Sequence, residues 1–226
     1  MRRLPLYDGR TAPLAIIERT QQVDRDTLAA MGIHGRACSH CEPGGVGLRA
    51  QLRNPCLPAE GEPGGLLVVG EYPTREEDAL GRPLSGAGGA LVRKLIAQHW
   101  QGPVAFDLAV RCNPGQQGVR EKFVDACRGY LAATVAEVRP TRVLALGGWA
   151  AYGLLGRSVS PFTTRRAVGW LANDGEPVPV FVVVQPNAGL QNRFLRRWVE
   201  DDVAWALTTA PHAAPWSSDA RIVETH

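Results

Sequence analysis

The sequence predicts a three-layer αβα fold around a central four-stranded parallel sheet. Short apolar runs, the pattern of strands buried on both faces, alternate with segments of helical periodicity. This alternation is typical of parallel strands joined by right-handed crossovers, with helices on both faces of the sheet. The expected strands are Leu66–Val69, Val104–Val110, Arg142–Leu146 and Val178–Val184, and the expected helices are Asp24–Met31, Ala90–Ile96, Lys122–Val138, Trp149–Leu155 and Leu190–Leu207.

Length and composition fit one domain of this class with appendages. The chain has 226 residues, 45% of them hydrophobic, and a net charge of +3 that permits nucleic-acid binding without requiring it. Its N-terminus lacks an apolar core of signal-peptide length, and no apolar run approaches the roughly 20 residues that span a bilayer. We therefore expect a cytoplasmic monomer with an N-terminal extension (1–37), a main domain (38–207) and a loosely held tail (208–226).

The stretch from Leu66 to Ile96 is the first candidate for a functional site. A buried strand is followed by about twenty residues that contain three successive acidic residues, two prolines and five glycines. In open parallel sheets ligands bind beyond the carboxyl ends of the strands, so this long polar segment predicts the site. The alternative is an ordinary connection between a strand and a helix, although such connections usually have only about 2–6 residues.

Four of the five cysteines form a candidate metal site. Cys38 and Cys41 form a C-x-x-C pair, Cys112 follows the second expected strand, and Cys127 lies fifteen residues later on the next helix. In a reducing cytosol such thiols are more often ligands or buried thiols than disulfides. Four thiolates suit a tetrahedral zinc ion or a 4Fe-4S cluster, and the spacing alone does not choose between them. Cys56 is left over as a structural or free thiol.

The order of these motifs resembles the family 4 uracil-DNA glycosylases from Cys38 to Leu207. That family has an early C-x-x-C, a strand ending in G-E-x-P-G before acidic residues, then G-R-P-F, a third cysteine after a strand and a fourth on the next helix. The resemblance implies a uracil-DNA glycosylase-like fold, DNA as the partner and a 4Fe-4S cluster rather than zinc. The counterparts here are Gly70-Glu71-Tyr72-Pro73-Thr74, Glu76-Glu77-Asp78, Gly81-Arg82-Pro83-Leu84, Gly86 to Leu91, and the four cysteines Cys38, Cys41, Cys112 and Cys127.

Several expected pocket positions depart from the family pattern. Leu108 stands where the family has an asparagine, Gln185 where it has the histidine of a His-Pro pair, Leu84 where an aromatic side chain stacks on the base, and Tyr72 where the residue is small. A glutamine donates only a neutral hydrogen bond, and loss of such a donor typically costs about 2.7–4 kcal/mol of transition-state stabilisation. We therefore expect weak or no uracil excision.

The resemblance assigns two sets of residues to the site. The expected catalytic residues are Glu71, Glu77, Asp78 and Gln185, because the carboxylates could position water or stabilise a cationic sugar. The expected base pocket comprises Gly70, Tyr72, Pro73, Thr74, Leu84, Leu108 and Asn187. The alternatives are a solvated acidic turn at residues 76–78 and simple turn chemistry around Pro186.

Arginines near the same face are candidates for DNA contact. Two follow the segment SVSPFTT, and others follow QPNAG, where the family inserts a segment into the minor groove. The alternative is that they only cover the surface of the last helix. The expected DNA-binding residues are Arg165, Arg166, Leu190, Arg193 and Arg196, with Leu190 as a wedge.

Two classes of function remain open from the sequence. One is a DNA glycosylase of altered base specificity, and the other is an inactive DNA- or protein-binding module that keeps the fold and the cluster. A nucleotide-binding protein that uses Gly70 or Gly147-Gly148 is a third interpretation, but neither site has the full glycine pattern or a Walker lysine.

Overall fold

A mostly parallel sheet forms the centre of the molecule. The computed structural model describes residues 56–115, 118–171, 177–210 and 223–224. Within these residues the strand order is β1-β3-β2-β4-β6-β5-β7. The four central strands β3, β2, β4 and β6 are parallel, whereas β1, β5 and β7 pair antiparallel at the edges. The strands are β1 (Glu60–Gly61), β2 (Leu66–Gly70), β3 (Val104–Leu108), β4 (Arg142–Leu146), β5 (Ala167–Leu171), β6 (Val178–Val183) and β7 (Val223–Glu224).

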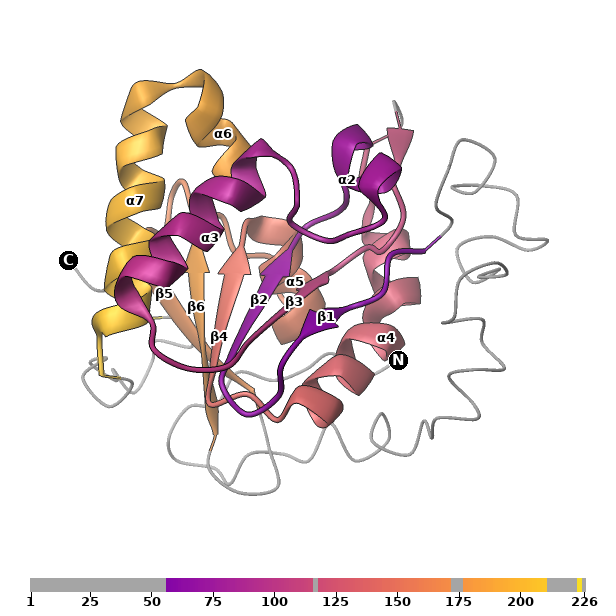
Figure 1. Ribbon diagram of the computed structural model, residues 1–226, viewed down its shortest axis with the longest axis horizontal. Helices are drawn as coiled ribbons and strands as arrows, with labels where there is room; N and C mark the ends of the chain where they lie inside the picture. Colours follow the sequence, from indigo (N-terminus) through magenta and orange to yellow (C-terminus); the bar gives the residue numbers. More distant parts are fainter. Residues whose placement is uncertain (1–55, 116–117, 172–176, 211–222, 225–226) are drawn as a thin grey trace.

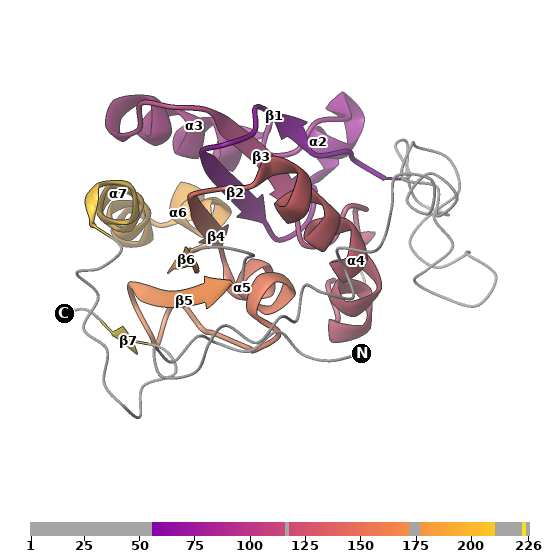
Figure 2. The ribbon, with the colours of Figure 1, turned by 90° about the horizontal axis from the view of Figure 1, so that it is seen from below.

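Helices cover both faces of this sheet, as expected for three layers. Helices α3, α6 and α7 lie on one face, and α4 and α5 lie on the other (Figures 1 and 2). Side chains alternate along each strand, so Leu66 and Val68 pack with α3 and α7, while Leu67 and Val69 pack with α4 and α5. The helices are α2 (Arg75–Leu80), α3 (Ala87–His99), α4 (Glu121–Val138), α5 (Gly148–Leu155), α6 (Pro186–Gln191) and α7 (Arg193–Thr208).

The four predicted strands are confirmed as the parallel centre of the sheet, but the predicted count of four is too low. The antiparallel strand β5 was missed because its sequence, AVGWL, has a glycine in the middle and a short apolar run. The two-residue strands β1 and β7 carry no pattern that a sequence could reveal.

The predicted last helix, Leu190–Leu207, is in fact two helices. Helix α6 begins at Pro186, and Asn192 separates it from α7. Asn192 has an extended backbone, and its side-chain oxygen accepts hydrogen bonds from the N–H groups of Phe194 and Leu195, so it is the N-cap of α7. The chain therefore turns a corner directly after the Gln185-Pro186 pair.

The N-terminal extension, the predicted helix Asp24–Met31 and the C-x-x-C pair Cys38 and Cys41 lie outside the described residues. No helix in the described part of the chain has both the length and the apolarity needed to cross a membrane.

Candidate active site

A pocket lies at the carboxyl ends of the central strands, where the sequence predicted the site. It encloses about 270 Å³ of space between its lining atoms, including its open mouth. Gly70 ends β2, Leu146 ends β4, and Gln185 follows β6, so three neighbouring parallel strands meet there. The lining residues are Gly70, Glu71, Tyr72, Glu77, Leu84, Gly88, Gly89, Leu146, Gln185, Pro186 and Asn187.

Most of the predicted pocket and catalytic residues therefore lie around this one pocket. Glu71, Glu77, Gln185, Gly70, Tyr72, Leu84 and Asn187 all line the pocket. Leu108 reaches it from β3, because a Cβ atom built on Gly70 would lie 2.8 Å from Leu108 Cδ2 and 3.0 Å from Leu84 Cδ2. The space directly above Gly70 is thus closed by two leucine side chains. Pro73, Thr74 and Asp78 do not line the pocket.

Glu71 lines the pocket, and its carboxylate binds the first turn of α5. Its Oε1 accepts a hydrogen bond of 3.1 Å from the Trp149 N–H, and the Gly148 N–H also contributes to holding the carboxylate. Burial nevertheless raises the pKa of Glu71, because desolvation outweighs these two hydrogen bonds. Gly147 (φ +102°) must lack a side chain, since a Cβ atom there would lie 2.3 Å from Glu71 Oε1. A carboxylate thus occupies the start of α5, and this argues against Gly147-Gly148 as a phosphate cradle.

The three acidic residues 76–78 lie on a short helix, α2, and not in a solvated turn, the alternative that the sequence left open. Thr74 and Glu77 form a capping box, in which the Glu77 N–H donates to Thr74 Oγ1 at 3.2 Å and the Thr74 N–H donates to Glu77 Oε2 at 2.8 Å. Glu77 is only 3% exposed, and its Oε1 also accepts from the Gly86 N–H at 3.3 Å. Burial raises the pKa of Glu77 despite these bonds.

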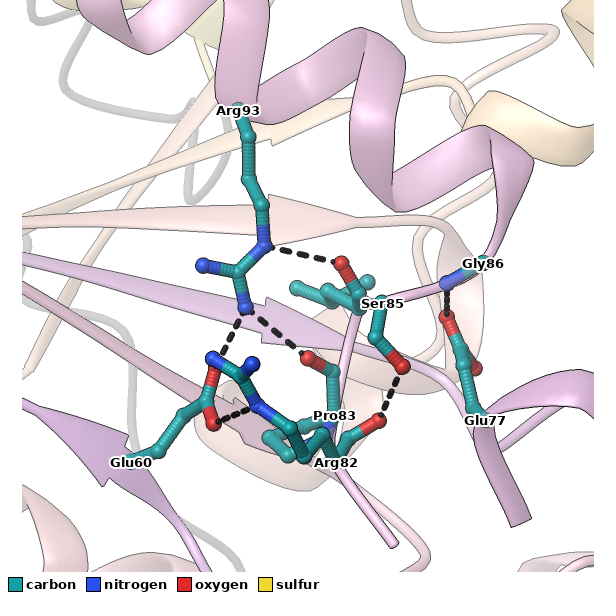
Figure 3. A network of polar contacts seen from close by, with 8 residues as sticks. Glu60, Glu77, Arg82, Pro83, Ser85, Gly86 and Arg93 are labelled. Atoms are coloured by element: carbon teal, nitrogen blue, oxygen red, sulfur yellow. Dashed lines mark hydrogen bonds and ion pairs between the residues drawn. The ribbon is translucent and has the colours of Figure 1, made fainter. Parts of the chain in front are cut away.

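The segment Arg82–Leu84, which corresponds to the G-R-P-F motif, is held by two residues that sequence analysis did not single out. Arg93 of α3 donates to the carbonyl oxygens of Leu84 (2.9 Å) and Pro83 (3.1 Å). It also pairs with Glu60 of β1 (Figure 3). Glu60 also pairs with Arg82 at 2.9 Å. Leu84 has a left-handed backbone (φ 51°), an unfavourable conformation for leucine that these contacts fix.

Gln185 has a defined orientation in the pocket. Its Oε1 accepts a hydrogen bond of 2.6 Å from the Asn187 backbone N–H, which caps the start of α6. Since a backbone N–H can bond only to the oxygen of the carboxamide, the Nε2 amino group must point elsewhere. Gln185 is partly buried and lines the pocket, so this amino group is available as a hydrogen-bond donor.

Two of the three described cysteines belong to the predicted metal set. Cys112, Cys127 and also Cys56 are buried in the core cluster against α4. The Leu57 N–H donates to the Arg111 carbonyl oxygen at 2.9 Å, so the residues that follow Cys56 and precede Cys112 are bonded to each other. Burial acts to lower the pKa of Arg111, but Asp107, Cys56 and Cys127 together raise it overall. The described residues alone contain no group of three or more metal ligands.

The predicted DNA-binding arginines fall into two groups. Arg165 and Arg166 both bind the fully buried carboxylate of Asp202 on α7, at 2.9 and 3.0 Å. They therefore join the β5 segment to α7, and any role in DNA contact would be additional. Arg193 and Arg196 are exposed at the start of α7, close in sequence to Leu190, which is 43% exposed. Phe194, 63% exposed, is a further apolar side chain there that the sequence analysis missed.

A second hollow, between α4 and α5, is comparable in size, and Arg128 is the one charged residue in its lining. It holds about 280 Å³ and is lined mainly by apolar residues such as Leu131, Val135 and Leu154. The pocket at Gly70 is the better candidate because it combines carboxylates, carboxamides and a tyrosine.

Comparison with known proteins identifies the family of the chain. The family model described as the uracil DNA glycosylase superfamily matches residues 61–207, which include every described element from β2 to α6 and nearly all of α7. The chain belongs to this superfamily. A Type-4 uracil-DNA glycosylase of Sulfurisphaera tokodaii is 30% identical over 162 residues, which cover 67% of this chain and 73% of that protein. A second, from Saccharolobus solfataricus, is 26% identical over 204 residues, covering 82% and 89% of the two chains.

Superfamily membership agrees with the observed α/β fold. The recognised motifs place their residues at the strand ends that form the pocket. The positions at which this chain departs from the family pattern, Leu108, Gln185, Leu84 and Tyr72, lie at or against the pocket rather than scattered over the surface.

Proposed function

We propose that this protein is a DNA glycosylase-like protein that binds DNA and accommodates a flipped base, with altered base specificity and weak or no uracil excision. The observation that carries the proposal is the pocket itself. The carboxylates of Glu71, directly after β2, and of Glu77, on α2, line it. Leu84 and Leu108 narrow it above Gly70, and Gln185 offers a neutral donor. Related proteins carry the name Type-4 uracil-DNA glycosylase.

A flipped base needs a pocket, a donor to the departing base and a carboxylate near the sugar. Gln185 supplies the donor. Both carboxylates are bound to backbone N–H groups, Glu71 at α5 and Glu77 at α2 and Gly86. In this proposal the Glu71 carboxylate acts on water or on the sugar while it stays bound to the N–H groups of Trp149 and Gly148. Asp78 lies outside the lining and in this proposal supports α2 rather than the chemistry.

The alternative is a binding module that has lost the chemistry. Two observations favour it. The carboxylates serve as helix caps, and two leucines occupy the space that a stacked base would need. In this reading the protein recognises DNA or a protein partner through the fold without cleaving a glycosidic bond.

We further propose a 4Fe-4S cluster held by Cys38, Cys41, Cys112 and Cys127. The chemistry of the described donors fits, because Cys112 and Cys127 are buried thiols in one core cluster. Cys38 and Cys41 lie outside the described residues and would supply the other two ligands. Bound there, such a cluster would tie the segment before β1 to β3 and α4. Residues 38–207 would then form one functional domain.

DNA contact is proposed for Arg193, Arg196 and Leu190 at the corner between α6 and α7. This corner follows the pocket residues Gln185 and Asn187 directly, and Arg193 and Arg196 are exposed. Phosphate contacts there would position the duplex, and Leu190 or Phe194 would enter the stack. Arg165 and Arg166 are partly exposed beside Asp202, which leaves some of their surface for phosphate.

Binding to duplexes with and without a stable abasic-site analogue tests the proposal. A base-flipping protein should prefer the duplex with the abasic analogue, because no unpairing and unstacking energy is spent there. Equal affinity for the two duplexes would favour non-specific binding through the arginines alone. No binding to either duplex at low salt would contradict the DNA function in both of its forms.

A further inference from the structure

We infer that Arg111 compensates the negative charge of the metal centre that Cys112 and Cys127 help to hold. The inference rests on the proposed cluster, and it adds a residue that is not one of the four ligands. Arg111 directly precedes Cys112 in the chain and is only 3% exposed. A guanidinium group stays charged in proteins, so a buried one requires negative groups close to it.

Asp107 is the first negative group that contacts this guanidinium. Asp107 Oδ1 accepts a hydrogen bond of 3.0 Å from Arg111 Nε, and Oδ2 accepts one of 2.7 Å from Nη2. Asp107 is 1% exposed, and its neighbours two positions away, Ala105 and Ala109, belong to the core cluster packed against α4. Because side chains alternate along a strand, Asp107 points to the α4 face of the sheet as well. The ion pair therefore lies on the same face as the buried cysteines.

The guanidinium also contacts the side of α4 that carries Cys127. Arg111 Nη2 donates a hydrogen bond of 2.7 Å to Thr134 Oγ1, and the guanidinium carbon lies 5.5 Å from the centre of the Tyr130 ring. Tyr130 and Thr134 follow Cys127 by three and seven residues, which is the spacing of side chains on one helix face. The cation thus lies between the end of β3, next to Cys112, and the Cys127 face of α4.

The cysteines also act on Arg111 through their charge. Burial lowers the pKa of Arg111, but Asp107 raises it, and Cys56 and Cys127 raise it further. This coupling is reciprocal, so the cation stabilises negative charge on these thiols. Metal-bound cysteines are thiolates, and a centre with four of them carries a net negative charge, whether it contains zinc or a 4Fe-4S cluster. Metal binding therefore adds negative charge next to the cation.

Fold stability alone does not account for this buried ion pair. Replacement of a buried ion pair by well-packed apolar residues is often neutral or stabilising, so the core does not need the pair as such. Next to a negatively charged centre, the cation and its carboxylate partner have opposite effects. Arg111 should stabilise the more negative, reduced state of the cluster and raise its reduction potential, whereas Asp107 should lower that potential. Arg111 should also slow the loss of metal.

The test is a redox titration, followed by electron paramagnetic resonance, of the anaerobically purified full-length protein. Arg111→Gln should shift the equilibrium constant for reduction of the cluster about tenfold toward the oxidised form, which corresponds to about 59 mV. This is the scale of one unit charge acting over about 10 Å at an effective dielectric constant of about 20. Asp107→Asn should shift the constant in the opposite direction by a similar factor, because the cation is then uncompensated. Arg111→Lys, which keeps the charge, should stay close to the parent.

The opposite signs separate a charge effect from a structural one. Arg111→Gln and Asp107→Asn weaken the same ion pair, so a merely structural pair predicts shifts of the same sign. Arg142→Gln is the matched control, because Arg142 is also a buried arginine, 8% exposed, but donates to the carbonyl oxygens of Ala206 and Thr209 on the other face of the sheet. Arg142→Gln should destabilise the fold and leave the reduction potential unchanged.

The rate of metal loss to a chelator is a second measurement, and it also applies to a centre that contains zinc. Arg111→Gln should lose its metal about tenfold faster than the parent, on the same electrostatic scale, whereas Asp107→Asn should lose it no faster. If Arg111→Gln does not fold, Asp107→Asn decides alone, and its potential should be higher than that of the parent.

The possible outcomes keep this inference apart from the proposed cluster. If the parent holds the cluster but the potentials of the two variants are unchanged or shift in the same direction, the inference fails and the cluster stands. If the parent holds zinc, the cluster fails, and equal rates of metal loss in parent and variants would overturn the inference as well. A parent that binds no metal would refute both, and the duplex-binding experiment would still test the DNA function.

Discussion

The Glu71 carboxylate accepts a hydrogen bond of 3.1 Å from the Trp149 backbone N–H, 78 residues away in the sequence. This contact joins the end of β2 to the start of α5 beneath the pocket. Glu71, which is predicted to be catalytic, therefore also has a structural role. The effect of its ionisation on folding stability can be measured as a function of pH.

Replacing Glu71 by glutamine should make folding stability less dependent on pH. Burial raises the pKa of Glu71 above its usual value of 4.5, so the folded protein holds this proton more tightly than the unfolded chain does. As pH rises from 4.5 through the raised pKa, the unfolded state loses its proton first, and the contribution of Glu71 to stability falls. Glu71→Gln keeps an oxygen acceptor for Trp149 but does not ionise.

Urea unfolding at pH 4 and pH 7 checks this expectation. The stability of Glu71→Gln relative to the parent should be more favourable at pH 7 than at pH 4. Glu62→Gln, at an exposed position, is the control and should show no such difference. A Glu71→Gln variant that loses more stability at pH 7 than at pH 4 would mean that the ionised carboxylate is the favoured form.

Removal of the Arg93 guanidinium should loosen the pocket wall that contains Leu84. Arg93→Met leaves Glu60 and the carbonyl oxygens of Pro83 and Leu84 without their partner, which should cost about 2 kcal/mol of unfolding free energy. Arg82→Met is the matched control, because Arg82 binds the same Glu60 but has a side chain that is 63% exposed. It should cost less unfolding free energy than Arg93→Met does, because solvent screens an exposed ion pair. Equal losses of unfolding free energy in the two variants, measured by chemical denaturation, would show that Arg93 contributes no more than an exposed ion pair does.

Binding to DNA should weaken steeply with salt. Neutralisation of about 3 to 5 phosphates predicts a slope of about −3 to −4 in a plot of log affinity against log salt concentration. The double change Arg193→Glu with Arg196→Glu should flatten the slope. Lys94→Glu with Arg139→Glu changes the same number of exposed charges elsewhere, with Arg139 at the opposite end of the sheet, and should leave it nearly unchanged. Equal effects of the two pairs would place DNA contact elsewhere.

Anaerobically purified protein should be brown and contain about four irons per chain. Cys112→Ala and Cys127→Ala should each lose the iron, whereas Cys56→Ala should retain it although Cys56 is buried in the same cluster. Iron and zinc analysis of the parent and the three variants makes this measurement. Stoichiometric zinc without iron would refute the cluster. Loss of iron in Cys56→Ala would show that Cys56 is also needed to hold it.

The sequence predicted the part of the fold that periodicity encodes. The central strands are continuous apolar runs, and α4 has its apolar residues on one side, so both could be recognised. The capping box of α2 could have been recognised from Thr74 and Glu77, three residues apart, but the surrounding glycines and prolines concealed it. The break at Asn192 interrupts no hydrophobic pattern, and only its capping geometry reveals it.

The site could be predicted in location but not in its contacts. Parallel strands bring Gly70 and Gln185 to one edge, and this follows from topology. The pairing of Arg93 with Glu60, 33 residues apart, depends on how α3 approaches β1. The packing of Asn187 against Gly88 depends on how α3 and α6 approach each other. No local pattern records such a tertiary approach, so these residues were missed or assigned only a general role.

The pocket chemistry can be tested by restoring the family residues. Leu108→Asn with Gln185→His should raise uracil excision by about 10²-fold, the scale of one restored transition-state donor, because the carboxylates and the strand ends are still present. Each single variant should give a smaller gain. A double variant that folds and binds DNA but stays inactive would point to Leu84 or Tyr72 as the groups that close the pocket.

Single-turnover excision from duplexes that carry uracil, hypoxanthine or a modified pyrimidine tests the central claim most directly. Strand cleavage at the resulting abasic sites is measured for the parent and for Gln185→Ala. We expect the parent to be near background on uracil, and any activity on another base to fall by about 10²-fold in Gln185→Ala. Efficient uracil excision by the parent, at a rate that Gln185→Ala leaves unchanged, would contradict the account.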